Sequence, residues 1–206
     1  MTYSEIVALS LSIADREDSD LASRIDGFLY LIEAEINRLL RSLEKETSAI
    51  IPYVSADVYQ YNLPSDYEEM RFIGRITGTD RKSKVPFEFC NPEQISWAYQ
   101  NQCSDLFYSI NENKIEVYPA LSSTQALFLT YMQKVPPLSV AIPTNWLSIK
   151  HPDLYVSGLL MAISVFAKDW PAVDRFSAVF DKTIDQIFGK DLTSKYSGNS
   201  LRTRLG

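Results

Sequence analysis

The chain has 206 residues, a mass of 23.5 kDa and a formal net charge of −6 at pH 7. This length favours one domain, or a core with a small subdomain, and the globular composition (46% hydrophobic, 22% charged) excludes wholesale disorder and fibrous repeats. No apolar run reaches about 18 residues and the acidic start lacks a basic n-region, so we expect a soluble, cytosolic chain without a membrane span or secretory signal. Cys90 and Cys103 have no neighbouring histidine, and we expect both to be reduced thiols.

The residues that common catalytic sites need are missing from the sequence. The single histidine, His151, directly precedes Pro152 at a predicted helix start, which favours a capping or surface role. One histidine without a neighbouring Cys or carboxylate pair cannot build a Ser-His-Asp triad or an imidazole-based zinc site. The segment 74–78 lacks the glycine spacing of a phosphate-binding loop. We therefore predict no catalytic residue, no cofactor and no metal ligand.

One group of acidic residues, Asp66, Glu68 and Glu69, deserves a separate interpretation because paired carboxylates also serve acid/base catalysis. These residues follow Ser65 directly. The simpler interpretation is a solvated turn, or a short helical turn capped by Ser65. An enzyme remains the weaker alternative.

Helical periodicity dominates the first 46 residues. Residues 3–13 have apolar positions at helical spacing, enough for a short helix. After a charged break, a second helix of about six turns is predicted from Ser19 onward. Its apolar stripe, which we expect to face a core, consists of Leu21, Ile25, Phe28, Ile32, Ile36, Leu39 and Leu43.

The period changes to two between residues 47 and 134, which is typical of short strands. Turn residues separate the alternating segments, and about six antiparallel strands are predicted. A single helical turn is expected at 91–97, with Asn91 as its cap. The expected strands lie near 58–63, 70–76, 85–89, 106–110, 114–118 and 125–132.

Helical periodicity returns in the last third of the chain. Pro152 suits the first turn of a largely buried helix, and Pro171 suits the start of another, which we expect to end at Gly189. The order helix, strands, helix predicts an α+β fold in which the terminal helical regions form a bundle and the strands form an insertion. We assign 1–46 and 138–188 to the helical core, 47–137 to a β-rich subdomain and 189–206 to an extended C-terminal arm.

The predicted arm differs from the rest of the chain in charge. It has a charge of +3, against −9 for the first 188 residues, and it lacks apolar periodicity, which indicates a flexible tail that docks on an acidic partner. An inert terminus is the alternative. Sequence-specific DNA binding is disfavoured because four basic residues beside an acidic body are a weak footprint for nucleic acid.

Four segments, taken in order, resemble a known family. They are 61–67 (YNLPSDY), 108–119 (YSINENKIEVYP), 129–139 (LTYMQKVPPLS) and 145–155 (NWLSIKHPDLY). Their order and spacing are similar to those of the adaptor proteins of tailed bacteriophages, also called head-to-tail connector or head-completion proteins, especially of the short-tailed type.

The resemblance implies a structural virion protein of the neck. Twelve copies would form a ring below the portal protein after DNA packaging, extend the channel through which the genomic DNA passes, and present a surface to the tail nozzle or tube and the fibres. The arm would bind the portal. Its candidate contact residues are Lys190, Leu192, Lys195, Tyr196, Leu201, Arg202, Arg204 and Leu205.

Two other functions stay open from the sequence. One is a tail-associated cell-wall-degrading hydrolase, although no recognisable acid pair supports it. The other is a generic cytosolic binding module.

Overall fold

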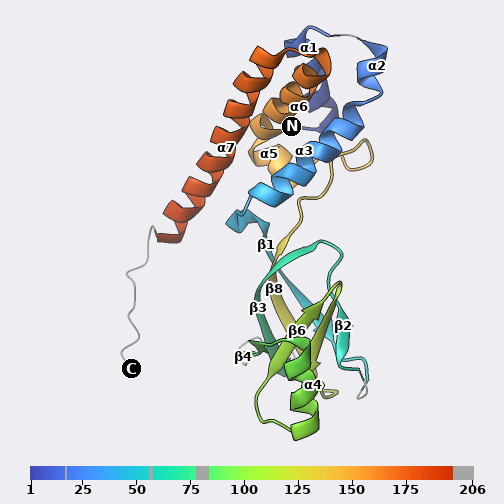
Figure 1. Ribbon diagram of the computed structural model, residues 1–206, viewed down its shortest axis with the longest axis vertical. Helices are drawn as coiled ribbons and strands as arrows, with labels where there is room; N and C mark the ends of the chain where they lie inside the picture. Colours follow the sequence, from blue (N-terminus) through green and yellow to red (C-terminus); the bar gives the residue numbers. More distant parts are fainter. Residues whose placement is uncertain (17, 56–57, 78–83, 197–206) are drawn as a thin grey trace. The chain divides into compact units, whose positions relative to one another are not determined.

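The computed structural model describes residues 1–16, 18–55, 58–77 and 84–196, with side chains described up to residue 189. Its helices and strands divide between two compact units (Figure 1). The helical unit contains Met1–Glu44 and Val135–Gly206, and the β unit contains Lys45–Lys134. The predicted α+β fold, with strands inserted between helical regions, is therefore confirmed.

In the helical unit, helix α6 contacts four other helices. Its neighbours are α1, α3, α5 and α7, and the side chains they share with α6 form one hydrophobic core. A capping box at Thr2 and Glu5 begins α1, as the short predicted helix requires. The helices of this unit are α1 (Tyr3–Ala14), α2 (Ser19–Ala22), α3 (Ile25–Leu39), α5 (Trp146–Lys150), α6 (Pro152–Ala167) and α7 (Trp170–Tyr196).

The long helix predicted from Ser19 is broken into α2 and α3, so that prediction was wrong in its continuity. The hydroxyl of Ser23 donates to the carbonyl of Asp20, and the amide of Arg24 bonds to the carbonyl three residues back, on Leu21. Both contacts tighten the backbone and interrupt the α-helical ladder. Most of the predicted apolar stripe still reaches the core, with Leu21, Ile25, Ile32 and Ile36 at most 2% exposed. Leu39, at the end of α3, is 49% exposed, so its predicted core position was wrong.

Close packing at Gly158 fixes the distance between α6 and two of its neighbours. A Cβ placed on Gly158 would lie 2.8 Å from Cγ2 of Ile32 in α3 and 3.1 Å from Cε2 of Phe180 in α7. Only glycine leaves room for both side chains at this point of α6. Three helices of the unit therefore meet at one residue that lacks a side chain.

The β unit consists of two four-stranded sheets. The first has the order β1-β8-β3-β4 and the second β2-β7-β6-β5. Both contribute side chains to one core, which includes Ile73 and Leu129 from the first sheet and Tyr61 and Val117 from the second. The strands are β1 (Glu46–Pro52), β2 (Gln60–Asn62), β3 (Tyr67–Thr77), β4 (Lys84–Pro86), β5 (Glu88–Phe89), β6 (Phe107–Asn111), β7 (Lys114–Tyr118) and β8 (Gln125–Gln133).

Three details of the β unit differ from the sequence prediction. The described residues contain eight strands, because β1 was not predicted and the segment 85–89 divides into β4 and β5, which belong to different sheets. Strand β5 pairs with β6 in parallel, an exception to the antiparallel prediction. The predicted single turn at 91–97 is a ten-residue helix, α4 (Pro92–Asn101), which Asn91 and Gln94 cap reciprocally.

Replacing Gly158 with alanine is expected to lower the free energy of unfolding by about 1–3 kcal/mol, because the added Cβ forces Ile32 and Phe180 away from α6. Gly27 in α3 is the matched control, since a Cβ there meets nothing within 4 Å and alanine should raise the free energy of unfolding by up to about 1 kcal/mol. Urea denaturation of both variants measures the difference. Equal effects would contradict the close approach at Gly158.

Candidate functional site

The predicted portal-binding residues do not all belong to an extended arm. Helix α7 continues through Gly189 to Tyr196, so the backbone at Lys190, Leu192, Lys195 and Tyr196 is helical. The remaining candidates, Leu201, Arg202, Arg204 and Leu205, lie outside the described residues. The prediction that the helix ends at Gly189 was therefore wrong.

The reason for this error lies in the backbone conformation of Gly189. A glycine ends a helix when it adopts a positive φ after the last helical turn. Gly189 has no such φ and remains in the helix, and nothing between it and Tyr196 is a proline. Sequence alone does not separate a terminating glycine from one tolerated inside a helix.

The backbone of α7 continues past the core residues that the structure describes. Ile187, which is 3% exposed, is the last core residue of α7 among the side chains described, and Phe188 is 47% exposed. From Phe188 to Tyr196 the helix adds nine residues, or roughly 13 Å at the usual rise. The first candidate portal contacts therefore lie on helical backbone that follows Ile187.

A buried polar network connects α3, α6 and the segment that returns from the β unit. Oε1 of Glu33 accepts a hydrogen bond from the amide of Leu138 at 2.6 Å and another from the hydroxyl of Tyr155 at 3.3 Å. The side-chain nitrogen Nδ2 of Asn145 donates to the Tyr155 hydroxyl at 2.8 Å and to the carbonyl of Pro136 at 2.6 Å. All these groups lie in the helical unit, and Glu33 is only 5% exposed.

Burial controls the protonation of this network. Removal from water raises the pKa of the Glu33 carboxyl, because the charged form loses its hydration, although the two accepted hydrogen bonds oppose the shift. Burial likewise raises the pKa of the Tyr155 hydroxyl. The network therefore holds the return segment against α3 at the cost of a buried carboxylate, a typical structural role for such groups.

Each residue of the acidic group Asp66, Glu68 and Glu69 has a different partner. Asp66 accepts a hydrogen bond from the Tyr131 hydroxyl at 2.9 Å, and Glu68 pairs with Lys45, whose side chain is 1% exposed. Oε1 of Glu69 lies 3.9 Å from Nη1 of the exposed Arg71. The turn at 65–66 was correctly predicted, but strand β3 rather than a helical turn follows it.

His151 lies at the junction of α5 and α6. Its backbone caps both helices, with its amide bonded to the carbonyl of Leu147, while its side chain makes no capping bond. Nε2 of His151 lies 3.9 Å from Oε2 of Glu44. The other carboxylate oxygen of Glu44, Oε1, accepts a hydrogen bond from Nζ of Lys150 at 2.8 Å. The predicted capping position is confirmed.

Aromatic and thiol groups gather where α4 covers the second sheet. Tyr99 packs edge-on against Tyr59 and Tyr118, with ring centroids 5.7 and 4.7 Å away. The Tyr118 hydroxyl donates to the carbonyl of Cys103. Cys90 and Cys103 both carry free thiols, and burial raises the pKa of Cys90. These groups pack the β unit and are not arranged as a nucleophile with a base.

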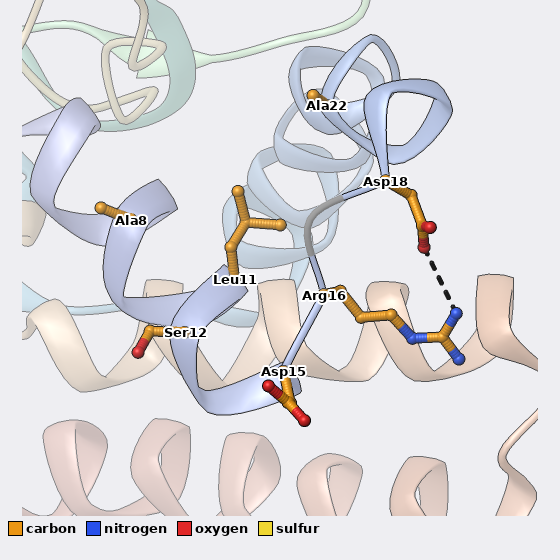
Figure 2. A pocket seen from close by; sticks show the side chains of 7 residues that line it. All are labelled: Ala8, Leu11, Ser12, Asp15, Arg16, Asp18 and Ala22. Carbon is orange, nitrogen blue, oxygen red and sulfur yellow. Dashed lines mark hydrogen bonds and ion pairs between the residues drawn. The ribbon is translucent and has the colours of Figure 1, made fainter.

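A hollow of about 410 Å³ lies between α1 and α2 on the helical unit. Figure 2 shows Arg16 and Asp18 at its rim, joined by an ion pair of 3.3 Å, with Asp15 nearby. Leu11, Ser12 and two alanines complete the lining. The hollow presents one solvent-exposed ion pair and small side chains, a surface suited to contact rather than to chemistry.

Two findings apply only to the described part of the chain. No group of three or more His, Cys, Asp or Glu side chains there could hold a metal ion. No helix there is long and apolar enough to cross a membrane.

The described residues form two compact units whose buried polar groups hold segments together, and the backbone of α7 continues to Tyr196. The chain belongs to the SU10 adaptor protein family, whose family model matches residues 1–204. This is a family of bacteriophage adaptor proteins, which confirms the resemblance found in the sequence, and it is not a known enzyme family. No curated protein matches the chain.

Sequence reasoning missed the Glu33 network. Glu33 occupies a core-facing position between Ile32 and Ile36, where a carboxylate is unexpected, and this was the available signal. Its partners on Leu138 and Tyr155 lie 105 and 122 residues away along the chain, so no local pattern reveals them.

Glu33→Ala is expected to lower the free energy of unfolding by about 2–4 kcal/mol, because it leaves the Leu138 amide and the Tyr155 hydroxyl without their acceptor. Glu33→Gln keeps an acceptor oxygen and should destabilise the protein far less. Urea denaturation at several pH values measures both effects.

The same experiment tests the sign of the pH dependence. Because the folded protein binds a proton at Glu33 more tightly than the unfolded chain does, stability falls as pH rises from the usual pKa of 4.5 through the raised value. Glu33→Gln should lack this component. An identical pH profile in wild type and Glu33→Gln would show that Glu33 does not contribute it.

Proposed function

We propose that this protein is the adaptor subunit of a phage neck: copies of the chain, twelve by the family resemblance, form a ring below the portal after DNA packaging. The ring extends the DNA channel and provides the attachment site for the tail nozzle or tube and the fibres. The observation that carries this proposal is the family match over residues 1–204.

The last part of α7 supports a contact with the portal. The helix continues past Ile187, the last core residue among the side chains that the structure describes, and the sequence from residue 189 onward has a charge of +3 in a chain of −6. A positively charged segment at the end of an acidic chain favours an acidic partner surface. The residues proposed to bind are Lys190, Leu192, Lys195, Tyr196, Leu201, Arg202, Arg204 and Leu205.

The acidic body is compatible with a channel for DNA. The first 188 residues have a net charge of −9, and a surface of that sign does not neutralise phosphates. Genomic DNA would then pass through the ring without sequence-specific binding. A passage that held phosphates tightly would oppose the movement of the genome.

Deleting residues 190–206 is expected to abolish attachment to the portal protein encoded by the same genome, while the body stays folded because the deletion keeps Phe180, Ile184 and Ile187, the core residues of α7 that the structure describes. Sedimentation of the mixture measures attachment, and circular dichroism measures folding. Unchanged attachment of the shortened protein would contradict the arm contact.

Two charge-reversed variants separate the effect of the arm's charge from the effect of removing the arm. Replacing Lys190, Lys195, Arg202 and Arg204 with glutamate should weaken attachment to the portal as the deletion does. The difference in attachment between this variant and the wild type should become smaller at high salt, because salt also weakens the wild-type contact. The control reverses four exposed cations outside the arm, Arg38, Lys168, Arg175 and Lys182, and so changes the net charge by the same amount. Equal loss in the control would assign the effect to net charge rather than to this segment.

A further inference from the structure

Strand β1 lies at one edge of the first sheet, with β8 on one side of it (Figure 1). It pairs with β8 in continuous antiparallel register from Glu46 to Pro52. In such a pair only every second residue points its amide and carbonyl toward the partner strand. Among the described residues, no hydrogen bond joins the backbone of β1 to a strand or loop other than β8. The free side of β1 therefore presents a row of backbone donors and acceptors at the spacing of a strand.

The core of the β unit is incompletely covered at β1. Ala49 stands opposite Leu129 and Ile51 stands opposite Leu127, so each pair of side chains lies on the same face of the sheet. Leu127 and Leu129 are 0% exposed, whereas Ala49 and Ile51 are only half-buried, although they pack against the same core. One more strand on the free side of β1 would cover these two side chains.

The other three edge strands of the two sheets are protected against pairing with another chain. Strand β4 has three residues, of which Lys84 carries a charge and Pro86 lacks an amide donor. Strand β2 has three residues and β5 has two. Short edge strands, and edge strands that contain lysine or proline, are the usual means by which proteins prevent the addition of a further strand.

Strand β1 lacks this protection over its middle five residues. It is seven residues long, and the segment from Thr47 to Ile51 contains no charge, proline or glycine. Its register with β8 has no shift, whereas that of β3 with β8 shifts twice. A bulge twists an edge away from an incoming strand, and β1 has none in its register. A regular, uncharged edge of this length is of the kind that pairs with a strand of another chain.

The free edge defines the chemistry of the segment that can bind it. A row of backbone amides and carbonyls at strand spacing is satisfied by another extended backbone, which forms one more rung of the sheet. Side chains of the added strand that lie beside Ala49 and Ile51 continue the core and have to be apolar. Those beside Ser48, on the exposed face of β1, remain in solvent. The partner is therefore an extended segment with apolar side chains at alternate positions.

A ring of like copies does not supply this segment from its own described strands. The edges of β2, β4 and β5 are protected, so none of them offers a matching free edge to β1 of a neighbouring copy. Pairing of β1 with β1 relates two copies by a two-fold axis, whereas neighbours in a cyclic ring meet through two different surfaces. The proposed portal contacts follow Ile187 of α7, in the other unit. These facts favour the tail nozzle or tube protein, here called the tail protein, as the source of the strand.

We infer that β1 of each copy binds an extended segment of the tail protein as an additional strand of the first sheet. This inference rests on the proposed function, which requires an attachment site for the tail, and it assigns that site to the free edge of β1. Backbone hydrogen bonds supply affinity in such a contact, and the half-buried Ala49 and Ile51 select apolar side chains.

Hydrogen exchange of residues 46–52 tests the added strand. It is measured by mass spectrometry on the wild-type protein alone, with the portal protein, and with the portal and tail proteins encoded by the same genome. In the protein alone, the amides bonded to β8 should exchange slowly and the alternate amides fast. Binding of the tail protein should abolish fast exchange in this segment. Unchanged exchange in the complex with the tail protein would overturn the inference.

Two lysine variants of adjacent residues test the same edge by binding. In Ala49→Lys the long side chain can reach solvent along the free edge of the single chain, but an added strand would bury its ammonium group. Ser48→Lys is the matched control, because Ser48 lies on the exposed face and its replacement stays in solvent with or without the strand. Ala49→Lys should lose the tail protein and keep the portal, and Ser48→Lys should keep both.

Circular dichroism checks that both variants are folded, and the exchange of the wild-type protein decides the question if Ala49→Lys does not fold. Equal binding of the tail protein by two folded variants would contradict the contact at β1. Slow exchange that the wild-type protein alone acquires as its concentration rises would overturn the assignment to the tail protein, because the strand would then come from a second copy.

The outcomes separate this inference from the proposed function. A wild-type protein that binds the portal and tail proteins without a change of exchange at residues 46–52 would overturn the β1 contact and leave the adaptor role intact. Slow exchange at β1 on binding the tail protein, without attachment to the portal, would support the β1 contact and overturn the portal contact. A wild-type protein that binds neither would overturn both.

Discussion

The helical unit depends on the buried carboxylate of Glu33. This one group accepts the amide of Leu138 and the hydroxyl of Tyr155, and Tyr155 in turn receives the amide of Asn145. Since a buried acceptor without donors is costly, each partner has to be present for the others to be stable. The segment that leaves the β unit is thereby bound to α3 and α6 at the point where it enters the helical unit. A second contact, from Asn37 to the amide of Val135, reinforces the same attachment.

The close approach at Gly158 has a consequence for the surface. Because α6 contacts α1, α3 and α7, half of its own residues are buried, and the outer sides of α3 and α7 become surfaces that the unit presents. An apolar residue on those sides, such as Tyr30 or Trp170, contributes nothing to the core of the single chain. Exposed apolar residues gathered on two helices that are held firmly from behind are typical of protein interfaces.

The sequence predicted the features that arise from local periodicity. The apolar stripe of α3, except Leu39, the helix begun by Pro152 and the β6–β7 hairpin each follow from a pattern that spans a few residues, and the structure confirms them. Strand β1 was missed because its residues are only half buried on alternate positions, which weakens the pattern. The pairing of β5 with β6 and the partners of Glu33 depend on residues far apart in the chain, which no short window contains. Gly189 was misjudged because its backbone angle, and not its identity, decides whether a helix ends.

Helix α7 joins the core of the helical unit to the residues proposed to bind the portal. Phe180, Ile184 and Ile187 contribute to the core, and the helical backbone continues from there to Tyr196. A single continuous helix fixes the angular and axial positions of these parts relative to one another, because an α-helix has a defined rise and twist per residue. Packing of the first part of α7 on α6 therefore also sets where the helical start of the proposed arm lies in each copy. The arms of a ring built from such copies would be presented at regular intervals, as simultaneous binding to a symmetric portal requires.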